Sequence, residues 1–265
     1  MNNNNIEAKD IFIGKGAVIH PTAKIRGVSG KAKSIYIGDH TYIGADVQII
    51  CDDFRIGDFG KIHHHTNIHG NQPCSIGHNA WIGQYTIIDS VGGVSIGNNC
   101  GIGAHSQLWS HIKYGDQLEG CRFEQTKKLQ VGNDVWFVGH SIVSPITAED
   151  KSMALVGSVV TKDMKYNEIY AGNPAKSISD KIGSQFNHVS VEEKKSKLVN
   201  LLKKFNPEST IKIVISNDEI DVADGCSYFN VSDRTYSKNQ SEEEIAFMKF
   251  LLPEKAKFVP QTQEN

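Results

Sequence analysis

The chain carries isoleucine–glycine pairs at a regular spacing between Ile13 and Ile102. Some of these pairs are six residues apart: Ile37-Gly38 and Ile43-Gly44, Ile76-Gly77 and Ile82-Gly83, Ile96-Gly97 and Ile102-Gly103. A second period of 19 or 20 residues links Ile37, Ile56, Ile76 and Ile96. Neither period is typical of an amphipathic helix or an alternating strand. The pattern predicts a solenoid, in which the isoleucines stack from coil to coil and each following glycine lets the chain bend sharply.

The repeat stops after Leu108 and resumes at Val131. A long interruption in a closely phased solenoid is either functional or disordered. The segment at about 110–130 has several apolar residues that favour an ordered loop with its own anchors. These residues are Tyr114, Leu118, Cys121 and Phe123.

Beyond Gly183 the hydrophobic period changes. Ser190-x-x-Glu193 and Ser241-x-x-Glu244 are capping boxes, and each predicts the start of a helix. The apolar faces of the two helices would hold Leu198, Leu201, Leu202 and Phe205, and Ile245, Met248, Leu251 and Leu252, with Pro253 ending the second. Strands are predicted at 211–215 and 227–231. We expect a repeat domain at 1–183 and a small α/β domain at 184–265, to which the sequence assigns no chemistry.

The repeats IGDHTYIGADVQI, IGHNAWIGQYTI and IGNNCGIGAHSQL resemble those of the hexapeptide-repeat acyltransferases, from about Ile11 to Lys176. AEDKSMALVGSVVTKDM and YAGNPAKSIS follow the pattern of that family's final coils. The resemblance implies a mainly β fold, a left-handed parallel β-helix of triangular cross-section with an inserted loop and a C-terminal α/β appendage. It also implies a homotrimeric, acetyl-CoA-dependent acetyltransferase similar to sugar (galactoside) and xenobiotic O-acetyltransferases. The acceptor would be a hydroxyl or amine of a sugar or nucleotide-sugar used in surface polysaccharide synthesis.

Direct acetyl transfer, without an acyl-enzyme, needs a general base, and histidine suits this role at neutral pH. In acetyltransferases of this fold the base typically lies at the mouth of an inserted loop, so the resemblance favours His111, with His105 and His140 in reserve. A carboxylate would orient the base. Asp89 resembles the acidic residue of the galactoside enzyme at the end of the equivalent strand. Asp116 and Glu119 compete for that role.

The segment VWFVGHS resembles the VWIGSH-type segment of the family, which lines the pantetheine channel. The resemblance places Trp136 in this channel, together with the backbone of Gly139, Val156, Gly157 and Ser158. An amide near Gly139 would stabilise the oxyanion. Thr161, Lys162 and Lys176 would meet the adenine and phosphates of acetyl-CoA, where cations are favourable.

A rival interpretation comes from KIHHHTNIHG, which contains His63, His64, His65 and His69. Three imidazoles and an open position make a catalytic zinc site, and γ-class carbonic anhydrases have this fold. Equivalent faces recur every 19 or 20 residues, however, so neighbouring histidines should project in different directions. We therefore expect no metal. A third interpretation, a non-catalytic scaffold, is disfavoured by the ordered loop that a histidine opens.

Composition narrows the classes of partner. A net charge of −2 over 265 residues indicates no nucleic-acid partner. Five cysteines without a C-x-x-C motif suit reduced thiols in a cytosol: Cys51, Cys74, Cys100, Cys121 and Cys226. The start, MNNNNIEAKD, lacks a basic region before an apolar stretch, and no apolar run is long enough to span a bilayer. These features favour a cytoplasmic protein.

Overall fold

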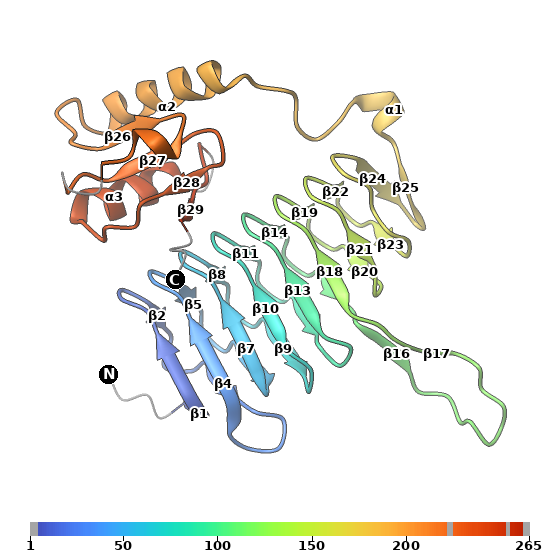
Figure 1. The fold of residues 1–265 in the computed structure, drawn as a ribbon. Helices are drawn as coiled ribbons and strands as arrows, with labels where there is room; N and C mark the ends of the chain where they lie inside the picture. Colours follow the sequence, from blue (N-terminus) through green and yellow to red (C-terminus); the bar gives the residue numbers. More distant parts are fainter. Residues whose placement is uncertain (1–4, 222–224, 253–254, 262–265) are drawn as a thin grey trace. The chain divides into compact units, whose positions relative to one another are not determined.

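The computed structural model describes residues 5–221, 225–252 and 255–261. The chain divides into two compact units, Met1–Phe186 and Asn187–Asn265. Figure 1 labels the strands and helices of each unit. Among the described helices, none is both long and apolar enough to cross a bilayer.

The first unit is a left-handed parallel β-helix, as predicted, and its strands line up in three faces (Figure 1). Face A consists of β3 (Lys24–Arg26), β6 (Gln48–Cys51), β9 (Asn67–Gly70), β12 (Ile87–Asp89), β15 (Gln107–Leu108), β20 (Ile142–Val143) and β23 (Val159–Val160). Face B consists of β4 (Ala32–Ile37), β7 (Asp53–Ile56), β10 (Cys74–Ile76), β13 (Val94–Ile96), β18 (Leu129–Val131) and β21 (Thr147–Ala148). β1 (Ile6–Ile13) pairs with both β3 and β4.

Face C consists of β2 (Val18–Ile19), β5 (Tyr42–Ile43), β8 (Lys61–Ile62), β11 (Trp81–Ile82), β14 (Gly101–Ile102), β19 (Trp136–Phe137), β22 (Met153–Ala154), β24 (Ile169–Gly172) and β25 (Ala175–Ser177). A short helix, α1 (Ser179–Ile182), follows.

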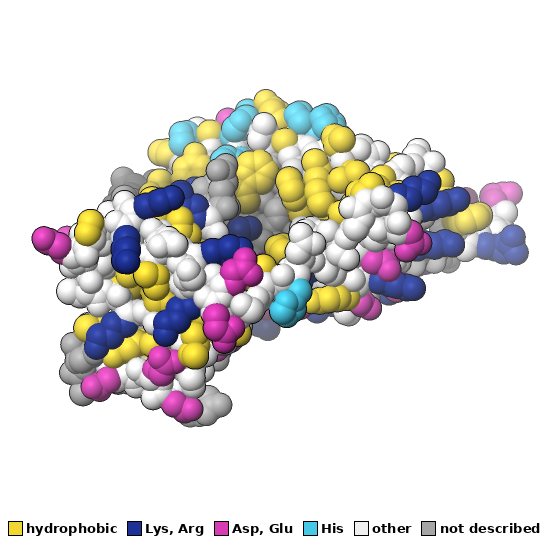
Figure 2. Space-filling view, turned by 90° about the horizontal axis from the view of Figure 1, so that it is seen from above, with side chains coloured by type: hydrophobic (Ala, Val, Ile, Leu, Met, Phe, Trp, Pro, Cys, Tyr) yellow, Lys and Arg dark blue, Asp and Glu magenta, His cyan; other side chains and the backbone are white. Residues whose placement is uncertain are grey.

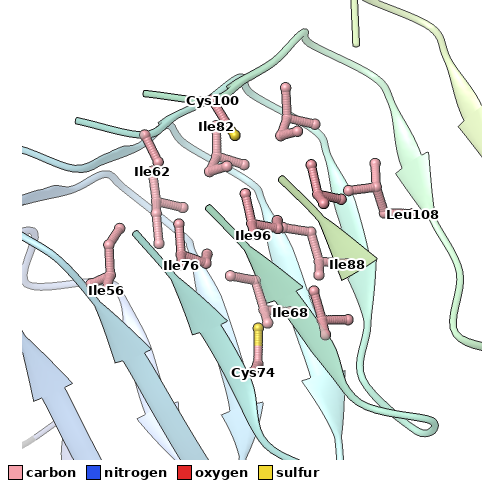
Figure 3. Packing of buried hydrophobic residues seen from close by; sticks show 14 of the residues in the cluster. Ile56, Ile62, Ile68, Cys74, Ile76, Ile82, Ile88, Ile96, Cys100 and Leu108 are labelled. Atoms are coloured by element: carbon pink, nitrogen blue, oxygen red, sulfur yellow. The ribbon is translucent and has the colours of Figure 1, made fainter. Parts of the chain in front are cut away.

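The core is a set of stacked isoleucine columns, one for each face. On face B, Ile56 pairs with Ile76 and Ile76 with Ile96, and all three are at most 2% exposed (Figure 3). The predicted 20-residue period is therefore the length of one coil. Each isoleucine is removed from water only by the coils on either side of it, so the stack is held together by burial between neighbours.

The glycines do not make the sharp turns that the sequence suggested. The left-handed backbone conformation falls two residues later, at Tyr85 and His105, with φ of 57° and 60°. The glycines instead let successive coils approach. A Cβ on Gly103 would lie 2.1 Å from the amide nitrogen of Gly139, which is far too close for any side chain.

The insertion at about 110–130 is a β-hairpin that extends from the coils (Figure 1). Its strands are β16 (His111–Lys113) and β17 (Glu124–Thr126), which pair in antiparallel fashion. The segment is ordered, as expected. However, Tyr114, Leu118 and Phe123 do not anchor it to its own chain, because they are 102%, 97% and 81% exposed.

The second unit is a small α/β fold. Its helices are α2 (Val191–Phe205) and α3 (Glu242–Leu251), and its sheet has the order β26 (Lys212–Val214), β27 (Tyr228–Asn230), β28 (Thr235–Tyr236), β29 (Val259–Pro260). A 3₁₀ turn, η1 (Asn217–Glu219), lies between β26 and β27. Ser190 and Ser241 cap the two helices, as the sequence predicted. Pro253, the expected stop, lies outside the described residues.

Candidate active site

Asp89 and His111 meet at the edge of face A, where the hairpin leaves the coils. Asp89 ends β12 and is fully buried, and His111 begins β16. The distance from His111 Nδ1 to Asp89 Oδ2 is 2.7 Å. Ser110 donates both its backbone N–H and its hydroxyl to the same carboxylate oxygen, each at 2.9 Å. Because Nδ1 is engaged by Asp89, Nε2 is the nitrogen of His111 that can accept a proton.

Two opposing effects act on the Asp89 carboxyl. Burial alone would raise its pKa, since a low-dielectric interior disfavours charge. The hydrogen bonds from His111 and Ser110, and the charge that His111 can carry, outweigh burial and bring the pKa of Asp89 below its ordinary value of 3.8. Asp89 is therefore ionised at neutral pH, which is the state that orients and stabilises a protonated imidazole.

His69 lies on the other side of the same carboxylate. Its Nε2 is 3.8 Å from Asp89 Oδ1, and its side chain is 42% exposed. In the sequence, His69 follows three other histidines, and no local pattern connects it to Asp89. The coil period could have done so, because residues 20 apart share a column, and Asp89 pairs directly with His69 between β12 and β9.

The other candidate carboxylates and bases lie elsewhere. In the hairpin, the side chain of Asp116 accepts hydrogen bonds from the amides of Leu118 and Glu119, which makes a local turn. His105 and His140, the reserve bases, stack on each other at 4.9 Å at the corner between faces C and A. Tyr85 and His65 extend the same stack.

The histidines of KIHHHTNIHG diverge. His65 stacks on Tyr85, His63 packs against Trp81, and His69 faces Asp89. Within residues 5–221, 225–252 and 255–261, no three His, Cys, Asp or Glu side chains converge closely enough to hold a metal ion.

The residues expected to contact the donor fall into two groups. Trp136, Gly139, Val156 and Gly157 belong to adjacent coils, and the carbonyl of Gly139 accepts from the N–H of Gly157 at 3.1 Å. In the described part of the chain, the N–H groups of Gly139 and Val156 have no acceptor. These amides can bind the carbonyls of an extended ligand.

The second group of expected donor contacts is more dispersed. Ser158 is fully buried, and its backbone is engaged within the coils: its N–H donates to the carbonyl of Leu155 at 3.2 Å, and its carbonyl accepts from the N–H of Ile142 at 2.9 Å. Thr161 and Lys162 follow β23 at the same edge of face A as Asp89, several coils further along, because Ile88, Leu108, Val143 and Val160 pair in one register. Lys176 lies in β25 on face C, and all three residues are exposed. The structure of one chain therefore does not bring these three residues together with Trp136.

The two halves of the candidate site lie on different faces of one prism. Trp136 is in face C, whereas Asp89 and His111 are at the far edge of face A. Within the first unit, outward side chains on two different faces point in different directions. A ligand that touches both halves would therefore need two copies of the chain.

No family model matches the chain. The bifunctional protein GlmU of Anaplasma marginale (strain Florida) is 33% identical over 109 residues, which are 39% of this chain and 23% of that protein. The chain thus spans about a quarter of the length of the curated relatives that it matches first.

Solved structures of similar fold include a mutant of the N-acyltransferase AntD from Bacillus cereus in complex with dTDP-4-amino-4,6-dideoxyglucose and coenzyme A. It is 18% identical, with a TM-score of 0.45, over 77% of this chain and 93% of that one. Another is the hexapeptide-repeat-containing acetyltransferase VCA0836 from Vibrio cholerae with acetyl-coenzyme A. It is also 18% identical, with a TM-score of 0.40, and the match covers 57% of this chain and 72% of that one. In its repeats and its fold, the chain resembles the hexapeptide-repeat acetyltransferases.

Proposed function

We propose that the protein is an acetyltransferase that moves an acetyl group from acetyl-CoA to a hydroxyl or amine of a sugar or nucleotide-sugar. The observation that carries the proposal is the hydrogen bond between His111 and the buried carboxylate of Asp89 at the mouth of the hairpin. A fixed, partly exposed imidazole backed by an ionised carboxylate is suited to general base catalysis. We infer the sugar acceptor and a role in polysaccharide synthesis from the resemblance of the repeats to those of the hexapeptide-repeat acyltransferases.

In the proposed reaction, Nε2 of His111 accepts the proton of the acceptor as its oxygen or nitrogen attacks the thioester carbonyl carbon. Asp89 stabilises the imidazolium that results. The amide of Gly139 donates to the oxyanion, since it has no acceptor among the described residues. When the carbon–sulfur bond breaks, His111 returns the proton to the leaving thiolate. Because the acceptor itself attacks the thioester, no acyl-enzyme forms.

We place the donor in a groove between two copies of a homotrimer. One copy would supply Asp89 and His111, and the next would supply face C with Trp136 and the amides of Gly139 and Val156. This arrangement is supported by the separation of the two groups onto different faces. Thr161, Lys162 and Lys176 would meet the adenine and phosphates along the later coils.

The test is a thiol-release assay with the purified full chain, acetyl-CoA and a panel of sugars and nucleotide-sugars. We expect free CoA thiol only in the presence of an acceptor, and no effect of a chelator. Stoichiometric bound zinc, with activity lost when the zinc is removed, would contradict the proposal in favour of a metalloenzyme. Thiol release that is the same with and without every acceptor would contradict acetyl transfer.

A further inference from the structure

The outer side of face C carries exposed aromatic residues in a single column. Strand pairing aligns Tyr42 with Lys61, Lys61 with Trp81, Trp81 with Gly101, and Gly101 with Trp136. We call Tyr42, Trp81 and Trp136 the aromatic column; they are 37%, 37% and 45% exposed. Figure 2 shows hydrophobic side chains gathered on the coils beside a group of histidines.

The spacing of the aromatic column is regular. Each aromatic residue is separated from the next by two strand pairings, which correspond to about 9.5 Å. This distance is close to the length of two linked pyranose rings. Gly101 leaves a gap between the two tryptophans, and Trp136 leans into it: a Cβ on Gly101 would be 3.1 Å from Cδ1 of Trp136.

The ring of His63 contacts the rings of both Tyr42 and Trp81. The His63 ring lies 6.1 Å from Tyr42 and 4.9 Å from Trp81. Burial, with a smaller contribution from Lys61, lowers the pKa of His63, so this ring is neutral at pH 7. A rigid aromatic surface loses little conformational entropy on binding, which favours a ligand that stacks flat upon it.

The composition of the column favours a sugar chain over a second protein surface. Lys61 interrupts the aromatics, and lysine is depleted from the cores of protein–protein interfaces. The other positions are aromatic or glycine, with no aliphatic residue between Tyr42 and Trp136. Aromatic faces separated by polar groups match the alternating apolar faces and hydroxyls of pyranose rings.

We propose that the aromatic column binds a linear oligosaccharide, whose rings stack on Tyr42 and Trp81 while Lys61 contacts a polar or acidic substituent between them. The inference rests on the proposed function and narrows its acceptor from single sugars to chains. Starting at Trp136, the oligosaccharide would lie along the earlier coils. Acetyl-CoA would lie along the later coils, which include the one that carries Val156.

The test measures binding directly, by saturation-transfer NMR titration of the full chain with a neutral and an acidic hexasaccharide and with the corresponding monosaccharides. Trp81→Ala should weaken hexasaccharide binding about tenfold and leave monosaccharide binding unchanged. Lys61→Ala should weaken binding of the acidic chain more than binding of the neutral chain. The matched control is Phe12→Ala, an aromatic residue on β1 that is 49% exposed and lies outside the column.

Three results would overturn the inference: binding of neither hexasaccharide to the unmodified chain, equal losses for long and short sugars in Trp81→Ala, or a changed sedimentation coefficient of that variant. The last would identify the column as a subunit contact. Because binding is measured without acetyl-CoA, these results are distinct from a failure of the proposed acetyl transfer, which the thiol assay reports.

Discussion

At the scale of single residues, the candidate site depends on a carboxylate that is buried and yet ionised. Asp89 keeps its charge because it accepts hydrogen bonds from His111 and Ser110. Removing a partner from such a group leaves a buried polar atom unsatisfied, which costs more than the hydrogen bond itself contributes. A substitution at Asp89 should therefore have a measurable effect on stability as well as on catalysis.

His111→Ala should lower kcat by about 10²–10⁴-fold and leave the KM for acetyl-CoA nearly unchanged, because the imidazole acts in proton transfer and not in donor binding. Steady-state kinetics with the acceptor found in the thiol assay would measure both constants. His105→Ala is the control, since that ring belongs to the stack with Tyr85 and His140. If His111→Ala keeps nearly full activity, His111 is not the base, and His105 or His140 becomes the candidate.

Asp89→Asn should destabilise the protein in a pH-dependent way. The folded-state pKa of Asp89 is below its ordinary value of 3.8, so the unfolded chain binds this proton more readily. The carboxylate therefore stabilises the fold above about pH 4, and its contribution is lost as the pH falls through the folded-state value. At pH 7 the loss should be about 2–4 kcal/mol.

Thermal unfolding between pH 7 and pH 3 would check this prediction, with Asp116→Asn in the exposed hairpin as control. The difference in melting temperature between Asp89→Asn and the unmodified chain should shrink toward pH 3. A difference that stays constant with pH would mean that packing, and not charge, accounts for the loss.

At the scale of elements, the hairpin β16–β17 has few stabilising contacts within one chain. An isolated two-stranded hairpin is marginal in water. The ion pair between Lys113 and Glu124 at 2.6 Å is exposed and contributes little. Tyr114, Leu118 and Phe123 leave a large apolar area in contact with solvent in a single chain. Large exposed apolar patches mark interaction sites, so we expect a second copy of the proposed trimer to cover this hairpin.

Replacing Tyr114, Leu118 and Phe123 together with serine should shift the protein from trimer toward monomer in sedimentation velocity, because the apolar contact with the neighbouring copy is lost. Ile182→Ser is the control, since Ile182 is 58% exposed on α1 of the same unit. If the triple variant sediments as the unmodified chain does, the hairpin does not contribute to assembly.

At the scale of the whole molecule, the proposed site is shared between copies. His111→Ala and Trp136→Ala each disable a different half of it. Random mixing of the two inactive variants should restore activity, because about one interface in four would then carry both intact halves. The measurement is acetyl transfer after joint refolding, compared with each variant refolded alone. No recovery in mixed trimers, or full activity in a sedimenting monomer, would place both halves in one chain.

The sequence by itself determined the β-helix, because every coil repeats the same buried isoleucine positions and each position depends only on its neighbours in the stack. It also determined the helix starts at Ser190 and Ser241, since capping is local. The prediction of His111 as the base and Asp89 as its carboxylate rested on the family resemblance of the repeats and on the position of the insertion that interrupts them.

Tertiary structure decided what depends on contacts between coils. It brought His69 beside Asp89, and it moved the left-handed turn from the glycines to residues such as His105. It also showed that the apolar residues of the hairpin are exposed in a single chain. A hydrophobic pattern records which residues need burial, but not whether the same chain buries them. Only the packed coils reveal which side chains are left for a ligand or a second copy.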